Sequence, residues 1–271
     1  MRASDPAPGL EFPRLVAAPG AAGAPAVDNV GAMSLRVYLP DPPATSQPFA
    51  LPAAAARHVQ VRRLQPGDAF TVFDGRGVEW PARVQAMGRH EVVAVLGAAQ
   101  PVDRELPLRV TLAVGVPANE RMDWLVEKAT ELGVASIRPL QCERSVLRLD
   151  GERGQRRREH WQSVAEAAAG QCGRTRLPTI APMQPLAAML AATPPDAATL
   201  RWVLSLRADA VTPRRPHGGA VTLLSGPEGG LSPAEEDAAR AAGWQPVTLG
   251  PRVLRAETAP LAVLAWLSLP G

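Results

Sequence analysis

A glycine-rich loop between a strand and a helix is the clearest place for chemistry in this sequence. The segment Leu223–Glu236 reads LLSGPEGGLSPAEE, which predicts a buried strand, a loop and then a helix. Ser232 suits the N-cap of that helix, Pro233 its first turn, and Glu235 completes a capping box. The loop glycines leave room for a ligand against the backbone, and ligands bind at strand ends in α/β sheets. The alternative is a simple tight turn.

Phosphate binding by this loop is disfavoured. The loop lacks the Gly-Lys-Ser/Thr ending of a Walker loop and the Gly-x-Gly-x-x-Gly spacing of dinucleotide-binding proteins. The chain also has no acidic cluster with metal-ligand spacing, so a nucleotide hydrolase is a poor candidate and no metal site is expected.

A second loop, Leu249–Ala259, also follows a short strand and reads LGPRVLRAETA. It brings Arg252, Arg255 and Glu257 close together, either as an ion pair or as part of a site. The helix expected over 260–269 is apolar nearly all round, so it must be buried in the core or in a dimer interface.

The elements that must position these loops alternate between strand and helix from about residue 103, which predicts a mostly parallel α/β sheet. Helices are expected over 122–132, with Gly133 as its stop, and over 160–172, where Cys172 belongs to a packed stripe rather than acting as a nucleophile. Strands are expected at these ranges: 108–116, 135–140, 202–206, 221–224 and 246–249.

The first part of the chain has a different character. Residues 1–32 are rich in Ala, Pro and Gly and predict a disordered leader, so Met33 is an alternative start. Residues 33–102 predict a small β-rich domain, with a helix over 53–64 and a hairpin at Asp74-Gly75-Arg76-Gly77. Strands are expected at these ranges: 35–39, 69–73, 78–84 and 91–96.

Positive charge is concentrated between Arg138 and Arg176. This stretch holds nine arginines and five acidic residues, a net charge of +4, whereas the whole chain carries +3. Such a region suits a phosphate-rich partner, although a biased composition could produce it as well.

The sequence also indicates a compartment. No apolar run reaches the roughly 18 residues that span a bilayer, and no signal peptide is recognisable. We therefore expect a cytoplasmic protein with reduced thiols at Cys142 and Cys172.

Several motifs together resemble those of the RsmE-type methyltransferases, the 16S rRNA (uracil(1498)-N(3))-methyltransferases. The resemblance covers residues 34–270, and its two late motifs are highly specific in combination. The matching segments are 128–134 (KATELGV), 143–146 (ERSV), 166–178 with Gln171-Cys-Gly-Arg174, 225–230 (SGPEGG) and 249–258 (LGPRVLRAET). Arg36-Val-Tyr-Leu39 and the Phe73-Asp-Gly75 hairpin fit the PUA-like domain of that family.

The resemblance implies a fold and partners. The fold is a C-terminal SPOUT α/β trefoil-knot domain, residues 103–271, preceded by a small N-terminal β-rich PUA-like domain. Knots are rare, so chain topology alone would not predict this one. The implied partners are 16S rRNA within the small ribosomal subunit and a second copy of the chain in a homodimer, without a membrane or a metal.

The resemblance also implies a site that binds S-adenosyl-L-methionine in the knot. The expected cofactor-binding residues are Leu204, Ser205, Ser225, Gly226, Pro227, Glu228, Gly229, Gly230, Leu249, Gly250, Val253, Leu254 and Arg255.

The transfer itself requires loss of the proton from uracil N3. We expect Glu257 to act as general base and Arg174 or Arg255 to stabilise the uracil oxyanion; the alternative for Glu257 is a structural ion pair with Arg255 or Arg252. The arginines expected to contact RNA are Arg62, Arg63, Arg76, Arg144 and Arg174. A knotted methyltransferase acting on transfer RNA and a non-catalytic RNA-binding assembly factor are the competing hypotheses.

Overall fold

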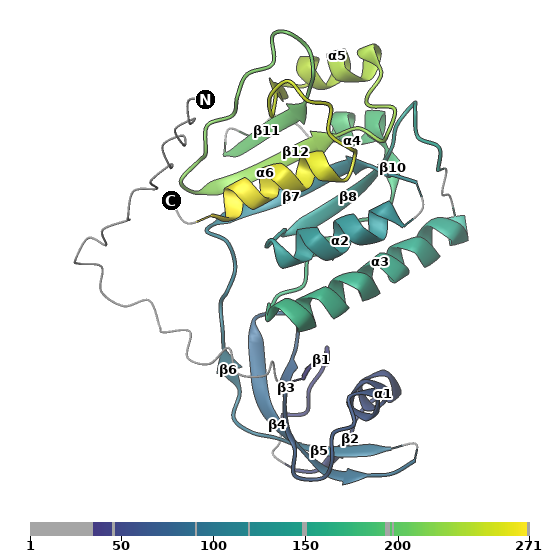
Figure 1. Ribbon diagram of the computed structural model, residues 1–271, viewed down its shortest axis with the longest axis vertical. Helices are drawn as coiled ribbons and strands as arrows, with labels where there is room; N and C mark the ends of the chain where they lie inside the picture. Colours follow the sequence, from purple (N-terminus) through teal and green to yellow (C-terminus); the bar gives the residue numbers. More distant parts are fainter. Residues whose placement is uncertain are drawn as a thin grey trace, which may run out of the picture. The chain divides into compact units, whose positions relative to one another are not determined.

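The computed structural model describes residues 35–44, 47–89, 91–118, 120–147, 151–192, 196 and 198–269. The expected leader, residues 1–32, and the alternative start at Met33 lie outside these residues. The described chain forms two sheets, a mixed one followed by a parallel one (Figure 1).

The first sheet belongs to the β-rich N-terminal part. Its elements are β1 (Arg36–Tyr38), β2 (Phe49–Ala50), α1 (Ala53–Val61), β3 (Ala69–Phe73), β4 (Val78–Met87), β5 (Val92–Leu96) and β6 (Gln100–Pro101). Strand order is β1-β3-β4-β5-β2, with β6 paired to β4. The expected hairpin is confirmed: β3 and β4 are antiparallel, and Gly75 (φ 73°) and Gly77 (φ 111°) adopt the positive φ that favours glycine.

The second sheet is parallel throughout, as predicted. Its strands are β7 (Leu108–Gly115), β8 (Ser136–Gln141), β9 (Thr179–Ile180), β10 (Gln184–Pro185), β11 (Thr199–Leu204), β12 (Gly219–Ser225) and β13 (Gln245–Val247). The order is β10-β8-β7-β12-β11-β13, with β9 beside β8. Every ladder is parallel, so the carboxyl ends of β11, β12 and β13 lie at one edge of the sheet.

Helices cover both faces of this sheet. They are α2 (Arg121–Glu131), α3 (Gly151–Cys172), α4 (Leu186–Ala192), α5 (Pro233–Ala241) and α6 (Thr258–Ser268). Side chains alternate between the faces along a strand. Leu223 joins the core under α2, α3 and α6, whereas the next residue, Leu224, joins the core under α4 and α5. No helix among the described residues has both the length and the apolar composition needed to cross a bilayer.

Helix α3 begins nine residues earlier than predicted, at Gly151 instead of His160. The added turns are rich in Arg and Glu, so they show no apolar stripe by which a buried helix is recognised in sequence. Pairs four residues apart stabilise them instead: Arg156 bonds Glu152 at 2.8 Å, and Gln155 bonds Glu159 at 2.8 Å.

The connection between β11 and β12 runs along the outer side of β13. Val211 N donates to Pro246 O at 3.1 Å, and Thr248 N donates to Val211 O at 3.0 Å. Strand β13 therefore lies between β11 and the connection that leaves β11. This enclosed position, followed by the return of α6 to β7 and β12, agrees with the knotted α/β fold that was expected.

A half-buried carboxylate connects the N-terminal sheet to the helical part of the second domain. Glu79 of β4 accepts hydrogen bonds from Arg36 at 2.8 Å and from Arg104 at 3.1 Å. The same two guanidinium groups donate to backbone carbonyls just after α3, Arg104 to Gly173 O at 2.8 Å and Arg36 to Arg174 O at 3.3 Å. Glu79 thus links the N-terminal sheet to the C-terminal end of α3.

Candidate functional site

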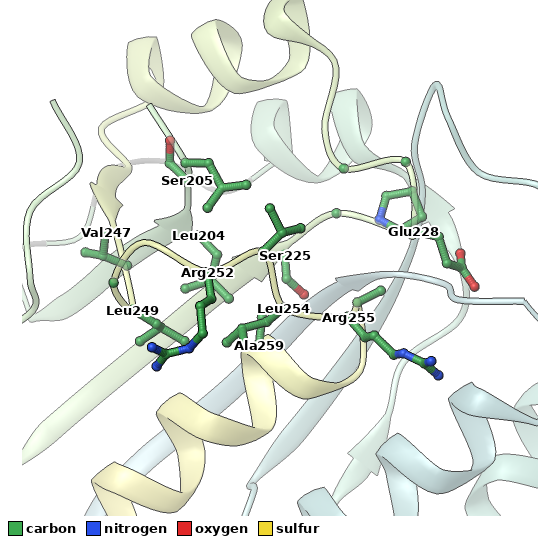
Figure 2. A pocket seen from close by; sticks show the side chains of 18 of the residues that line it. Leu204, Ser205, Ser225, Glu228, Val247, Leu249, Arg252, Leu254, Arg255 and Ala259 are labelled. Carbon is green, nitrogen blue, oxygen red and sulfur yellow. The ribbon is translucent and has the colours of Figure 1, made fainter. Parts of the chain in front are cut away.

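A cavity of about 550 Å³ opens where the carboxyl ends of β11, β12 and β13 meet (Figure 2). Its volume falls within the range of small-molecule sites. All thirteen residues expected to bind the cofactor line it: Leu204, Ser205, Ser225, Gly226, Pro227, Glu228, Gly229, Gly230, Leu249, Gly250, Val253, Leu254 and Arg255. The structure therefore brings the two loops singled out in the sequence into one site.

Six further residues, which were not expected to bind the cofactor, also line the cavity: Arg121, Leu206, Val247, Arg252, Ala256 and Ala259. Four of them, Leu206, Val247, Arg252 and Ala256, are within two positions of an expected residue, and Ala259 lies four positions after Arg255, so proximity in the chain could have indicated these five. Arg121 is different. It begins α2, and no local signal connects it to loops that lie more than eighty residues away.

The glycine-rich loop turns back sharply on itself. A Cβ built on Gly226 would lie 2.5 Å from Leu231 N and 2.6 Å from Gly230 C, so no side chain fits at this position. Gly230 has φ +68°, which favours glycine as well. The expected capping box then starts α5. Ser232 N donates to Glu235 Oε2 at 2.9 Å, and Glu235 N donates to Ser232 Oγ at 3.2 Å.

Neighbouring loops hold this turn in place. The Glu228 carboxylate accepts hydrogen bonds from Ala118 N at 2.8 Å and from Arg121 Nη1 at 3.0 Å. On the other side, Arg144 Nη1 donates to Gly229 O at 2.9 Å. Both contacts come from segments that follow other strands of the sheet, so the loop's position depends on the whole strand edge.

Ser225 has an unused hydrogen-bonding group inside the cavity. Its Oγ is buried and has no partner among the described residues. A buried hydroxyl without a partner is destabilising and is normally satisfied by a ligand or by water. Ser205 differs, because its Oγ donates to Glu236 Oε1 at 2.5 Å.

The lining fits a molecule with an apolar planar part and several polar groups. Leu204, Leu249, Leu254 and Ala259 supply apolar wall, as Figure 2 shows, and the loop backbone with Ser225 supplies polar groups. S-adenosylmethionine, with its adenine ring and its polar ribose and methionine groups, has this character.

Glu257 lies beside the cavity rather than in its lining. It precedes α6 and is only 7% exposed, and its Oε2 has no partner among the described residues. Its neighbours two positions away, Arg255 and Ala259, both line the cavity. The alternative reading, an ion pair of Glu257 with Arg255 or Arg252, is not found within the described part of the chain.

Arg174 is placed differently from the expectation. Its side chain is 5% exposed and forms an ion pair with Glu105. Its Nη1 also donates to Thr130 O at 2.9 Å and to Val134 O at 3.0 Å. These bonds engage the buried guanidinium, which does not line the cavity, and they favour a structural role for Arg174; its predicted roles in catalysis and RNA contact stay predictions.

The other arginines expected to contact RNA are exposed. Arg62 and Arg63 follow α1 directly, and Arg63 has a positive φ of 58°. Arg76, in the β3–β4 hairpin, pairs with Asp41 at 2.9 Å. Arg144 is exposed too, but its bonds hold the glycine-rich loop, so it acts on the cavity at least indirectly.

The cysteines do not resemble nucleophiles. Both are free thiols, and burial raises the pKa of Cys142 to about 12 and also raises the pKa of Cys172. Thiolates, rather than thiols, are nucleophilic. In the described residues, no three His, Cys, Asp or Glu side chains gather where they could hold a metal ion.

Comparison with known protein families gives two matches. Residues 104–268 match the family described as RNA methyltransferase domain, and residues 51–97 match the RNA methyltransferase PUA domain. The second match agrees with the PUA-like fold expected for the N-terminal part.

Individual relatives carry one common name. The chain is 30% identical over 228 residues to Ribosomal RNA small subunit methyltransferase E of Bacillus subtilis, covering 81% of this chain and 89% of that protein. It is 35% identical over 213 residues to the protein of that name from Synechocystis, covering 77% of this chain and 68% of the relative.

Solved structures extend the similarity to the fold. The chain resembles Ribosomal RNA small subunit methyltransferase E from Neisseria gonorrhoeae bound to S-adenosyl methionine, with a TM-score of 0.80 and 37% identity over 86% of this chain and 96% of that one. A Legionella pneumophila methyltransferase in complex with the same cofactor gives a TM-score of 0.79 and 33% identity, with coverage of 86% and 96%.

Proposed function

The chain belongs to the RNA methyltransferase family whose members are named Ribosomal RNA small subunit methyltransferase E, and on that basis we propose that it methylates N3 of a uracil in 16S ribosomal RNA. The methyl donor is S-adenosyl-L-methionine, as in the related structures. The uracil 1498 type of target, in the small ribosomal subunit, is what the resemblance of the two late loops to the family implies.

One observation carries the proposal: all thirteen residues expected to bind the cofactor line a single cavity at the strand ends. They come from three separate segments, 204–205, 225–230 and 249–255. Their convergence in space supports the proposal by geometry, beside the similarity to named relatives.

The chemistry required of the protein is modest. S-adenosylmethionine, when bound, supplies a methyl group already activated by its sulfonium, so the protein has to align this group with the target nitrogen. Backbone groups of the two loops and the Ser225 hydroxyl, which line the cavity, would hold the donor. The apolar wall formed by Leu204, Leu249 and Leu254 limits the access of water.

The target nitrogen carries a proton in neutral uracil, and this proton must leave before N3 can act as a nucleophile. We assign its removal to Glu257, because one of its carboxylate oxygens is buried without a partner among the described residues, and Arg255 and Ala259, two positions away on either side, line the cavity. Arg255 would stabilise the negative charge that develops on the uracil oxygens. Its side chain projects from the cavity loop, as Figure 2 shows.

The test is methyl transfer from labelled S-adenosylmethionine to small ribosomal subunits that lack the modification, followed by nucleoside analysis. N3-methyluridine at one site is the expected product. Cofactor binding without transfer to subunits would contradict the ribosomal target, and transfer RNA would be the next substrate. Absence of cofactor binding would favour the non-catalytic assembly factor.

We extend the proposal to assembly and location. The family resemblance supports a homodimer with the cofactor near the subunit interface, and exposed apolar side chains at the cavity, Leu206 and Val253, suit such a contact. Light scattering on the purified chain tests this, with a mass of about twice 28.6 kDa expected. A ribosomal substrate supports the expected cytoplasmic location.

A further inference from the structure

The cavity carries more positive charge than the cofactor requires. Its charged lining residues are Arg121, Arg252 and Arg255 against Glu228 alone, a net charge of +2. S-adenosylmethionine has a sulfonium, an ammonium and one carboxylate at neutral pH, so it is itself a cation. Like charges repel, and the excess positive charge therefore fits a second ligand that is anionic. An RNA phosphodiester is such a ligand.

Arg121 differs from the other two arginines because a carboxylate holds it in place. Its Nη1 donates to Glu228 Oε1 at 3.0 Å, and the same oxygen accepts from Ala118 N at 2.8 Å. Arg252 and Arg255 form no ion pair among the described residues, and their side chains extend to opposite sides of the cavity in Figure 2, with Glu228 on the side of Arg255. Arg121 is thus the most preorganised cation of the lining.

The ion pair leaves most of the Arg121 guanidinium available. This group has several N–H donors in a planar fork, and only one of them has a partner in the described structure. The side chain remains 44% exposed in the pair. A guanidinium with adjacent donors still unused can bind a phosphate through two parallel hydrogen bonds.

We infer that Arg121 binds a phosphodiester of the target RNA strand beside the nucleotide to be methylated, and that Glu228 positions it. This inference rests on the proposed function and adds a substrate-binding residue to the site. The competing anion is the methionine carboxylate of the cofactor, and the experiment separates the two.

The variant to compare with the full wild-type chain is Arg121→Gln. Cofactor affinity is measured by calorimetry, and methyl transfer to unmodified small subunits is measured at saturating cofactor. Glu228 keeps its hydrogen bond from Ala118 N in this variant, so the loop stays in place and the cofactor Kd stays within about twofold. In contrast, kcat/KM for subunits falls by about tenfold or more. The plot of log kcat/KM against log salt becomes shallower by about one unit, as expected for one lost phosphate contact.

Two further variants sharpen the result. Arg121→Lys keeps the charge without the bidentate geometry, so this variant retains the salt dependence and recovers part of kcat/KM. The same variant is used in place of Arg121→Gln if Arg121→Gln does not fold. Arg109→Gln removes an exposed arginine at the amino end of β7, the end of the parallel sheet opposite to the cavity, and it changes neither constant.

A rise in the cofactor Kd with kcat/KM for subunits unchanged at saturating cofactor would assign Arg121 to the cofactor carboxylate and overturn the inference. Unchanged values in both assays would overturn it as well. If the wild-type chain transfers no methyl group, the proposed function fails. Filter binding of subunits in the presence of S-adenosylhomocysteine then still tests Arg121, with weaker binding of Arg121→Gln expected and equal binding contradicting the inference.

Discussion

Gly115, the last residue of β7, lies directly against Pro227 of the glycine-rich loop. A Cβ built on Gly115 would be 2.5 Å from Pro227 Cδ and 2.6 Å from Pro227 N. Such distances are well below van der Waals contact, and one of the two atoms is backbone. The position of the cofactor loop therefore depends on the absence of a side chain in a neighbouring strand.

Substitution Gly115→Ala tests this dependence. The added methyl group must displace the loop, since Pro227 has no alternative rotamer that would make room, and overpacking of this kind costs about 1–3 kcal/mol. We expect a rise of about tenfold or more in the Kd for S-adenosylmethionine, measured by calorimetry. Gly88→Ala is the matched control, because its Cβ would meet nothing closer than 3.4 Å. An unchanged Kd in Gly115→Ala would show that the loop adapts freely.

Substitution Ser225→Ala should have different effects on the free and the bound protein. In the free chain the substitution removes a buried hydroxyl that has no partner among the described residues, so Tm should stay constant or rise. In the complex it removes a hydrogen bond to the cofactor, so the Kd should rise by about two- to tenfold. Thermal unfolding and calorimetry measure the two effects. Ser163→Ala, on the exposed side of α3, should leave the Kd unchanged, and a similarly unchanged Kd in Ser225→Ala would exclude contact with the cofactor.

The sequence was informative wherever the signal is local. The glycines and the capping box around Ser232 depend on neighbouring residues only, and the loops after β12 and β13, which were predicted to form one site, line the same cavity. Burial of a charged side chain could not be predicted in this way, because it depends on partners far along the chain. Arg174 meets Glu105 and the carbonyls of Thr130 and Val134, none of which a local motif reveals.

The position of Arg121 could not be predicted from the sequence either, because it too depends on a distant partner. Its place in the cavity depends on Glu228, 107 residues away in the sequence. Helix α3 was recognised only where apolar residues recur, since its charged N-terminal turns face solvent. Thus local chemistry was predictable from this sequence, whereas tertiary pairing between charged residues was not.

The buried Arg174 leads to a prediction about stability. Arg174→Met leaves the Glu105 carboxylate and two backbone carbonyls without their donor, and loss of one partner of a buried pair costs about 3–5 kcal/mol. Urea unfolding should show this loss, while the protein that remains folded should bind the cofactor normally. Arg176→Met, two residues further along, is the control. A stable Arg174→Met variant with a large loss of kcat would restore the catalytic role.

Glu79 predicts a dependence of stability on pH. Burial raises the pKa of this carboxyl, but hydrogen bonds from Arg104 and Arg36 outweigh burial and hold the pKa below its ordinary value of 4.5. The stabilisation is therefore fully present above pH 4.5 and is lost as the pH falls through the lowered value. Urea unfolding from pH 7 down to about 3 measures it, and Glu79→Gln should flatten the acid limb of the curve. Glu152→Gln, exposed on α3, should not. Equal slopes in wild type and Glu79→Gln would remove Glu79 from the acid response.

Glu257→Gln tests the proposed base directly. The amide has nearly the same shape as the carboxylate but cannot accept the N3 proton, so kcat should fall by about 10²- to 10⁴-fold with the cofactor Kd unchanged. Single-turnover transfer to unmodified subunits, with calorimetry for the cofactor, separates the two constants. Glu236→Gln is a demanding control, because Glu236 is an acidic residue near the cavity whose carboxylate is occupied by Ser205 and Arg207. If kcat is retained in Glu257→Gln, or if the Kd rises by the same factor, the buried carboxylate holds the start of α6 in place and another group or water takes the proton.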